Sequence, residues 1–132
     1  LQSKGVLYLL ESAIRPGMSS TALLGFNQYT LEHMMPKKWR NKWGALDDEA
    51  ATRRDRKLLT LGNLAIITHS LNASIRDADW PTKKQGKGYK DGLALSAGLA
   101  TMAGALEKES WNEGDIADRA EWLADKALEV WR

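Results

Sequence analysis

The chain has 132 residues, of which 43% are hydrophobic and 27% are charged, a composition that is ordinary for a soluble domain with one core. The absence of cysteine excludes disulfides, thiolate zinc sites and cysteine nucleophiles, and two histidines are too few for a zinc site built mainly from imidazoles. No secretory signal opens the chain and no segment is long and apolar enough to span a bilayer, so we expect a cytoplasmic protein without membrane contact.

The charge is unevenly distributed, although the net charge is only +2. Between Lys37 and Lys90 there are 13 Lys and Arg residues against 6 Asp and Glu, whereas the rest of the chain has 6 against 11. A basic centre is typical of proteins with a polyanionic partner. A single run such as 53–57 is equally compatible with a solvated helix face. Several separate runs lie around the same part of the chain, and this favours nucleic acid.

The first predicted elements are a helix and a short strand. Apolar residues recur at helical spacing from Val6 to Ile14, and Pro16-Gly17 ends the pattern, so a helix is expected over about 4–15. From Tyr29 to His33 apolar and polar residues alternate, which predicts a strand that carries His33 at its end. Pro36 would break this strand.

A second helix and a second strand follow. Asp47 or Asp48 suits the N-cap of a helix that runs to about Leu59. Gly62-Asn63 then predicts a turn that leads into an apolar strand, Leu64 to Thr68. Two strands alone are too small to be stable, so the flanking helices are expected to supply their core.

The C-terminal part is predicted to be helical. Pro81 suits the first turn of a helix, and the stretch 93–106, rich in Ala and Gly, would form a helix that packs closely against its neighbours. Asn112 would cap the last helix. Its apolar stripe would consist of Ile116, Ala120, Leu123, Ala127, Leu128 and Trp131. The sequence therefore predicts one α+β domain, 1–132, with two strands and a helix over about 27–90 and flanking helices over 4–15 and 93–132.

Residues with suitable chemistry lie close to the predicted strands. His33 follows Glu32 and precedes Pro36, while Asn63 and Asn72 lie on either side of the second strand. Carboxylate and carboxamide oxygens suit a hard divalent cation, and a neutral imidazole can accept a proton from water. These groups together predict metal-assisted hydrolysis of a phosphodiester. Because alternation places Glu32 and His33 on opposite faces, both can serve only if the strand bends or ends there.

The same segments resemble the C-terminal HNH-type nuclease domain of GmrSD-like, modification-dependent (type IV) restriction endonucleases. The resemblance covers nearly the whole chain. It is carried by Glu32-His33-Met34-Met35-Pro36, by Leu61-Gly62-Asn63-Leu64, by the stretch from Asn72 to Lys83, and by the ending from Trp111 to Trp131 with Asp115-Ile116, Arg119 and Leu123. Three departures are Trp80, where we expect phenylalanine, Asp77, where an asparagine is common, and Ala65-Ile66-Ile67, which replaces a more usual Thr-Leu-Leu.

The resemblance implies a mainly helical domain that encloses a small ββα-metal (HNH or His-Me finger) motif, and it implies a role for each motif residue. His33 would be the general base, Asn63 would hold the two-stranded ribbon or orient the imidazole, and Lys83 would face the phosphate. Glu32 and Asn72 would bind the divalent metal, Mg²⁺ in the first place and Mn²⁺ as an alternative.

The substrate implied by the resemblance is DNA. The basic residues around the motif that would contact it are Lys37, Lys38, Arg40, Lys84 and Lys87. The resemblance further implies a ParB-like N-terminal domain in the full-length chain and a role in phage defence through restriction of modified foreign DNA. Because the chain begins with Leu1 and not with methionine, we expect it to be a C-terminal fragment of that longer chain.

Each of these residues also has a structural interpretation. Without the resemblance, His33 is more often a satisfied structural histidine, Asn63 suits a turn, and Asn72 could cap a helix. His69, beside the second strand, is expected to be a surface or supporting residue. For the whole domain two alternatives stay open: a catalytically inactive DNA-binding domain, or a subunit-assembly domain that docks through its C-terminal apolar stripe.

Overall fold

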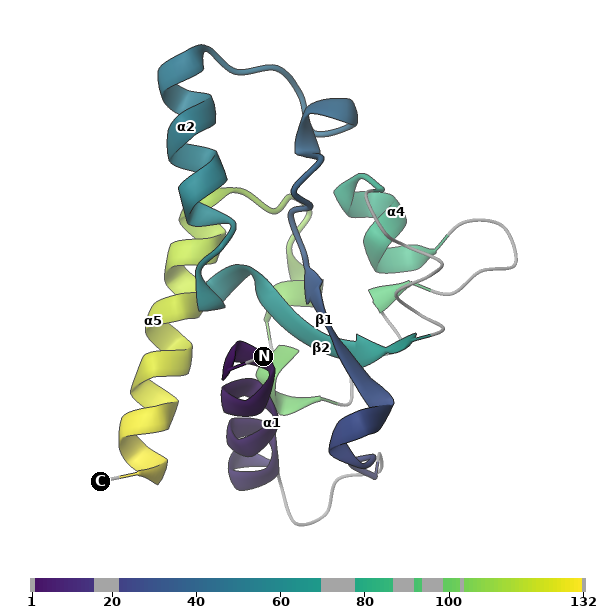
Figure 1. Cartoon of the computed structure of the whole chain (residues 1–132), viewed down its shortest axis with the longest axis vertical. Coiled ribbons are helices and arrows are strands. Elements are labelled where there is room, and N and C mark those ends of the chain that lie inside the picture. Colours follow the sequence, from purple (N-terminus) through teal and green to yellow (C-terminus); the bar gives the residue numbers. More distant parts are fainter. Residues whose placement is uncertain are drawn as a thin grey trace.

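The computed structural model of the chain describes residues 2–15, 22–69, 78–86, 92–93, 99–102 and 104–131. These residues form a mostly helical α+β structure, as the sequence predicts (Figure 1). Its helices and strands are α1 (Gln2–Ile14), β1 (Tyr29–His33), α2 (Asp48–Lys57), β2 (Leu64–Thr68), α4 (Trp80–Gln85) and α5 (Glu113–Val130). In the view of Figure 1, α1 and α5 lie to the left of the crossing strands and α4 lies to the right.

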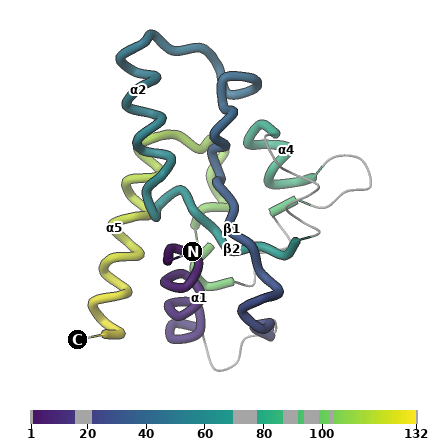
Figure 2. Tube along the Cα trace, viewed as in Figure 1, coloured from purple at the N-terminus to yellow at the C-terminus, as the bar shows by residue number. Residues whose placement is uncertain are grey.

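The two strands pair in antiparallel fashion, with Tyr29 opposite Thr68 and His33 opposite Leu64. After β1 the chain runs away from the sheet to α2 and returns to β2 beside α5 (Figure 2). Both predicted strands are confirmed, including the position of His33 at the end of the first. As a result, the last residue of β1 lies directly beside the turn that begins β2.

The helices begin where the sequence offers a capping side chain. Asp47 accepts the N–H of Ala50 at the start of α2, as predicted. Asn112 and Asp115 form a reciprocal capping box at the start of α5, in which each side chain accepts a backbone N–H from the other residue. These bonds satisfy N–H groups that a helix leaves unpaired at its first turn.

The core lies where α1 packs against the sheet and where α5 packs against α1 and the turn before β2. α1 contacts both strands and α5, and it contributes Leu7 and Leu10 to the core, each fully buried. From β2 come Ile66 and Ile67, and from α5 Ile116, all of them buried. The helices thus cover the apolar side chains of the strands, because two strands alone cannot bury these side chains.

The turn before β2 lies in direct contact with α5. Leu61–Asn63 is a single 3₁₀ turn. A Cβ atom added at Gly62 would collide with the carbonyl oxygen of Ile116 and would lie 2.9 Å from the Cβ atom of Ala120. Only glycine allows the turn to approach the helix this closely.

Two sequence-based expectations were wrong in detail. In place of a continuous helix over 93–106, the described residues form two short 3₁₀ turns, Ala100–Met102 and Ala105–Glu107. Gly104 precedes the second turn with φ of +82°, a left-handed conformation that a helix does not contain. The apolar stripe of α5 also ends early, because Leu128 and Trp131 are 60% and 50% exposed.

Candidate functional site

His33 is the last residue of β1, and its side chain is half-buried. The pKa of the imidazole lies below its ordinary value: burial lowers it most, and the charges of Lys37 and Lys83 lower it further. Within the described part of the chain, the imidazole makes no hydrogen bond. His33 is therefore neutral near pH 7 and able to accept a proton.

Asn63 fastens the segment after His33 to the turn before β2. Its buried side chain accepts the N–H of Met35 at 2.8 Å and the indole N–H of Trp111 at 3.0 Å. Its amide nitrogen donates to the carbonyl oxygens of Met35 (2.8 Å) and Leu58 (3.0 Å). The Asn63 carbonyl oxygen accepts a further bond from Met34 N–H. The side chain is thus fully used in holding the ribbon, and it makes no hydrogen bond to the imidazole.

Glu32 and Lys83 form a buried ion pair beside His33. The Lys83 ammonium, on α4, lies 3.0 Å from Oε2 of Glu32 and donates to the His33 carbonyl oxygen at 2.6 Å. The other carboxylate oxygen of Glu32 accepts the His33 N–H at 3.1 Å. Burial raises the pKa of Glu32, and the charge and hydrogen bond of Lys83 oppose that rise. The pair joins α4 to the end of β1.

The position of Lys83 differs from the one that the resemblance implied. Its side chain is fully buried and points to Glu32, so it presents no ammonium to a phosphate at the surface. Asn72, the second predicted metal ligand, lies outside the described residues. The carboxylate of Glu32 is a ligand type that suits Mg²⁺, but each of its oxygens already accepts a hydrogen bond. Among the described residues, no three His, Asp or Glu side chains come together as a cation site.

The predicted DNA contacts fall into two groups. Lys37 and Lys38 are exposed directly after the site. Arg40 instead donates to both carboxylate oxygens of Asp55, at 3.3 and 3.0 Å, and Lys84 donates to the carbonyl oxygen of Lys108. Lys87 also lies outside the described residues.

Arg119 is a site residue that the sequence analysis assigned no role. Its guanidinium, on α5, donates to the carbonyl oxygens of Leu61, Gly62 and Leu64, which belong to the turn that carries Asn63 and its continuation. It also donates twice to the carbonyl oxygen of Thr101. Burial lowers the pKa of Arg119 to about 10. One signal was present in the sequence, because an arginine at position 119 interrupts the apolar stripe between positions 116 and 123.

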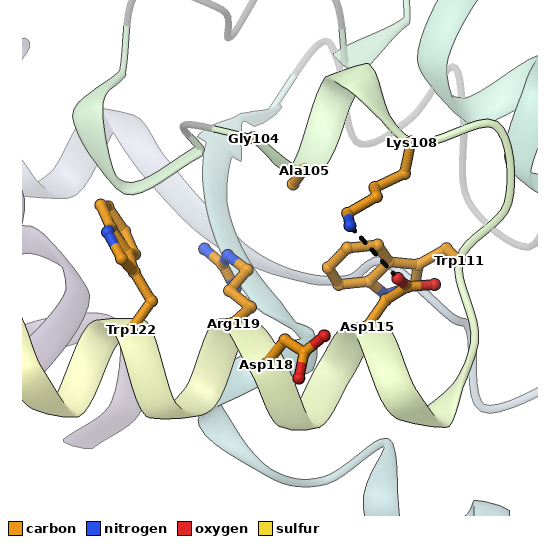
Figure 3. A pocket seen from close by; sticks show the side chains of 8 residues that line it. All are labelled: Gly104, Ala105, Lys108, Trp111, Asp115, Asp118, Arg119 and Trp122. Carbon is orange, nitrogen blue, oxygen red and sulfur yellow. Dashed lines mark ion pairs between the residues drawn. The ribbon is translucent and has the colours of Figure 1, made fainter.

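A small cavity of about 150 Å³ lies between α5 and the segment that precedes it (Figure 3). Its α5 wall includes Arg119 and Trp122, and Lys108 faces Asp115 across it at 3.7 Å. The donors of Arg119 are directed to backbone oxygens, so the guanidinium serves the turn before β2 and not the cavity.

A comparison with protein families decides where the chain belongs. The family described as the C-terminal domain of GmrSD restriction endonucleases matches residues 2–126. The chain belongs to this family. No curated protein and no solved structure matched it.

Within this GmrSD C-terminal domain, the residues that carried the resemblance converge on one place. Glu32, His33 and Lys83 come together at the end of β1, and Asn63 lies one residue away along the antiparallel ladder. Arg119 donates from α5 to the backbone on either side of Asn63. None of the helices among the described residues is long and apolar enough to cross a membrane.

Proposed function

We propose that this domain is a metal-dependent DNA endonuclease of the HNH type, which hydrolyses phosphodiester bonds in the restriction of modified foreign DNA. Membership of the restriction endonuclease family supports a nuclease-related role and DNA as the substrate. The assignment of the general base rests on the pKa of His33, on its exposure and on its position in the fold. Its imidazole has a lowered pKa, is half-exposed at a strand end, and is followed by the exposed Lys37 and Lys38.

In the proposed reaction, His33 removes a proton from a water molecule. The water oxygen attacks the phosphorus while the bond to the 3′ oxygen breaks, and the leaving oxygen takes up a proton from solvent. The products are a 5′-phosphate and a 3′-hydroxyl. A divalent cation, Mg²⁺ or Mn²⁺, would supply stabilisation of the charge on the phosphate and the leaving oxygen when bound, with Glu32 and Asn72 as its proposed ligands.

The other residues of the site hold and position. Asn63 keeps the segment after His33 in register with β2 through its bonds to Met35. Lys37 and Lys38 would contact DNA phosphates, because their ammonium groups are exposed beside the base. A ParB-like N-terminal domain, a cytoplasmic location and phage defence complete the proposal, on the ground of the family alone.

The test is nicking of supercoiled plasmid by the purified domain, with and without Mg²⁺ or Mn²⁺. His69→Ala provides a matched control, because His69 is the only other histidine and its side chain is exposed. We expect metal-dependent nicking by the wild type and His69→Ala, and none by His33→Ala at unchanged DNA affinity. Nicking by His33→Ala at the wild-type rate would exclude His33 as the base.

A second candidate function is a catalytically inactive DNA-binding domain. The buried pair of Lys83 with Glu32 favours it, because the carboxylate is not open to a cation. This function predicts salt-dependent DNA binding without nicking under any metal condition.

Exposure of Leu128 and Trp131 favours a role in subunit assembly, which predicts oligomerisation that depends on protein concentration.

A further inference from the structure

The Lys83 ammonium lies where a cation would bind. Among the described residues, it contacts a carboxylate oxygen, Oε2 of Glu32, and a carbonyl oxygen, that of His33. These are the two kinds of protein oxygen that coordinate hard metal ions. Lysine is almost never fully buried unless it is paired, and Lys83 has an exposed fraction of 0%.

The position of Lys83 is built into the framework of the site. Asp79 caps α4, and its carbonyl oxygen accepts the Lys83 N–H at 2.9 Å. Trp80, at the start of α4, stacks on Trp111 with ring centroids 5.3 Å apart. The indole N–H of Trp111 in turn donates to Asn63, which fastens the segment after His33. The contacts that fix the end of β1 therefore also fix the helix that carries the ammonium.

We propose that Lys83 is the resident cation of the Glu32 carboxylate, and that a divalent cation binds this carboxylate only when the Lys83 ammonium leaves it. The inference rests on the proposed function, because the cation concerned is the one that the nuclease would use. A metal ion on Oε2 would lie within a few ångströms of the ammonium, in a buried place where like charges repel strongly. The single charge of Glu32 cannot by itself neutralise both cations. Metal binding is thus an exchange in which the metal enters and the ammonium leaves.

The exchange also gives Lys83 a second position. A lysine side chain has a long flexible stem and can move its charge to the surface. Once released, the ammonium becomes available to a bound phosphate, which is the role that the family resemblance implied for this residue. The ion pair and the phosphate contact are then two states of one side chain.

The first experiment measures Mn²⁺ binding by the loss of the electron paramagnetic resonance signal of free Mn²⁺. The proteins are the wild type, Lys83→Gln and Lys83→Arg, which keeps the positive charge. Lys84→Gln is the matched control, because its ammonium lies next along the helix and bonds to Lys108 instead. We expect Lys83→Gln to bind Mn²⁺ about tenfold more tightly than the wild type, as a typical coupling between competing ligands requires. Lys83→Arg and Lys84→Gln should match the wild type.

The double variant Glu32→Gln with Lys83→Gln tests whether the tighter Mn²⁺ binding of Lys83→Gln depends on the Glu32 carboxylate. It should lose the tighter binding, since Glu32 is the ligand that the exchange exposes. Binding by Lys83→Gln that is no tighter than the wild type would overturn the proposal. So would a gain that persists in the double variant.

A second measurement uses the wild type, because removal of Lys83 leaves a buried carboxylate without its partner and threatens folding. The ammonium resonances of lysines are followed by ¹H–¹⁵N NMR during titration with Mg²⁺, and the Lys83 signal is assigned by its absence in Lys83→Arg. We expect Mg²⁺ to shift the Lys83 signal or to bring it into rapid exchange with water, while the Lys84 signal stays in place. An unchanged Lys83 signal at saturating Mg²⁺ would overturn the proposal.

These readouts are independent of cleavage, so the two proposals can fail separately. Plasmid nicking that needs His33, together with an unchanged Lys83 signal, would leave the nuclease assignment intact and reject the exchange. An observed exchange of Lys83 for the metal ion, without nicking, would support the exchange and reject the nuclease assignment.

Discussion

Asn63 and Met35 are joined by two hydrogen bonds, both 2.8 Å long, one in each direction between the side-chain amide and the backbone. Two bonds in opposite directions are also what joins a hydrogen-bonded residue pair in an antiparallel sheet. The pairing therefore continues the contact between β1 and β2 beyond the last paired residues, His33 and Leu64. The segment that follows the proposed base is therefore also hydrogen-bonded to the turn before β2.

The first prediction concerns this pairing. Asn63→Ala should lower the free energy of unfolding by about 3 kcal/mol or more, because it leaves several buried donors and acceptors without partners. Urea unfolding measures the effect. Asn27→Ala, an exposed asparagine in the Phe26–Gln28 turn, is the control and should change little. A stability loss no larger than that of the control would show that the bonds to Met35 contribute nothing.

A second prediction concerns the buried guanidinium. Arg119→Met keeps much of the apolar volume but removes the guanidinium donor from the carbonyl oxygens of Gly62, Leu64 and Thr101. We expect a loss of about 3 kcal/mol in stability, and Arg119→Lys should restore little of it, since an ammonium lacks the planar fork. Arg53→Met, on the exposed face of α2, should stay within about 0.5 kcal/mol of the wild type. Full stability of Arg119→Met in thermal unfolding would contradict this account.

A third prediction tests the contact between the turn and α5. Gly62→Ala should destabilise the domain by about 2 kcal/mol or more, because the new methyl group meets the backbone of Ile116, which cannot move aside. Gly5→Ala, within α1, has no atom within 4 Å of the new methyl group and should stabilise the helix by about 0.5–1 kcal/mol. Equal effects of the two substitutions in chemical denaturation would refute the steric explanation.

A fourth prediction gives a pH dependence. Burial raises the pKa of Glu113, but its hydrogen bonds and the charge of Arg54, 3.0 Å away, outweigh this and hold the pKa below its ordinary value of 4.5. The unfolded chain therefore binds the proton more readily, so the pair contributes stability above about pH 4.5 that is lost as the pH falls through the lower folded-state pKa. Glu113→Gln should lose less stability than the wild type between pH 5 and pH 3, roughly the range in which carboxylates titrate.

The control for this measurement is Glu121→Gln, on an exposed position of the same helix. It should follow the wild-type curve of unfolding free energy against pH. Parallel curves for the wild type and Glu113→Gln would mean that the Arg54 pair contributes nothing to acid sensitivity.

The fifth prediction concerns DNA. The double substitution of Lys37 and Lys38 by Gln should weaken DNA binding and reduce the slope of log affinity against log salt by about 2, if each ammonium contacts one phosphate. Fluorescence anisotropy at several salt concentrations measures the slope. Lys126→Gln on α5 removes a positive charge far along the chain and should leave the slope unchanged. An unaltered slope in the double variant would remove these lysines from the interface.

Local signals in the sequence predicted the elements well. Alternation identified β1, the apolar run after Gly62-Asn63 identified β2, and Asp47 and Asn112 identified the starts of α2 and α5, because each signal acts within a few residues. The helix expected over 93–106 was wrong because composition favoured it while the backbone at Gly104 is left-handed.

The arrangement of the site depended on contacts that no local pattern contains. Glu32, which pairs with Lys83, lies 51 residues earlier in the chain, and the carbonyl oxygens of Leu61, Gly62 and Leu64 that bind Arg119 lie at least 55 residues before it. The sequence could therefore name Glu32, His33 and Lys83 as neighbours of one motif, but not that two of them neutralise each other.

The close approach of Gly62 to α5 has a consequence for how the two-stranded motif can be inherited. The two strands and α4 lie within one continuous part of the chain. The turn before β2, however, packs against the backbone of Ile116 and is bound by the guanidinium of Arg119, and both of these residues belong to α5. A copy of residues 27–90 transferred to another protein would lack these contacts with α5. We therefore expect the motif to be transferred between proteins only together with the last helix.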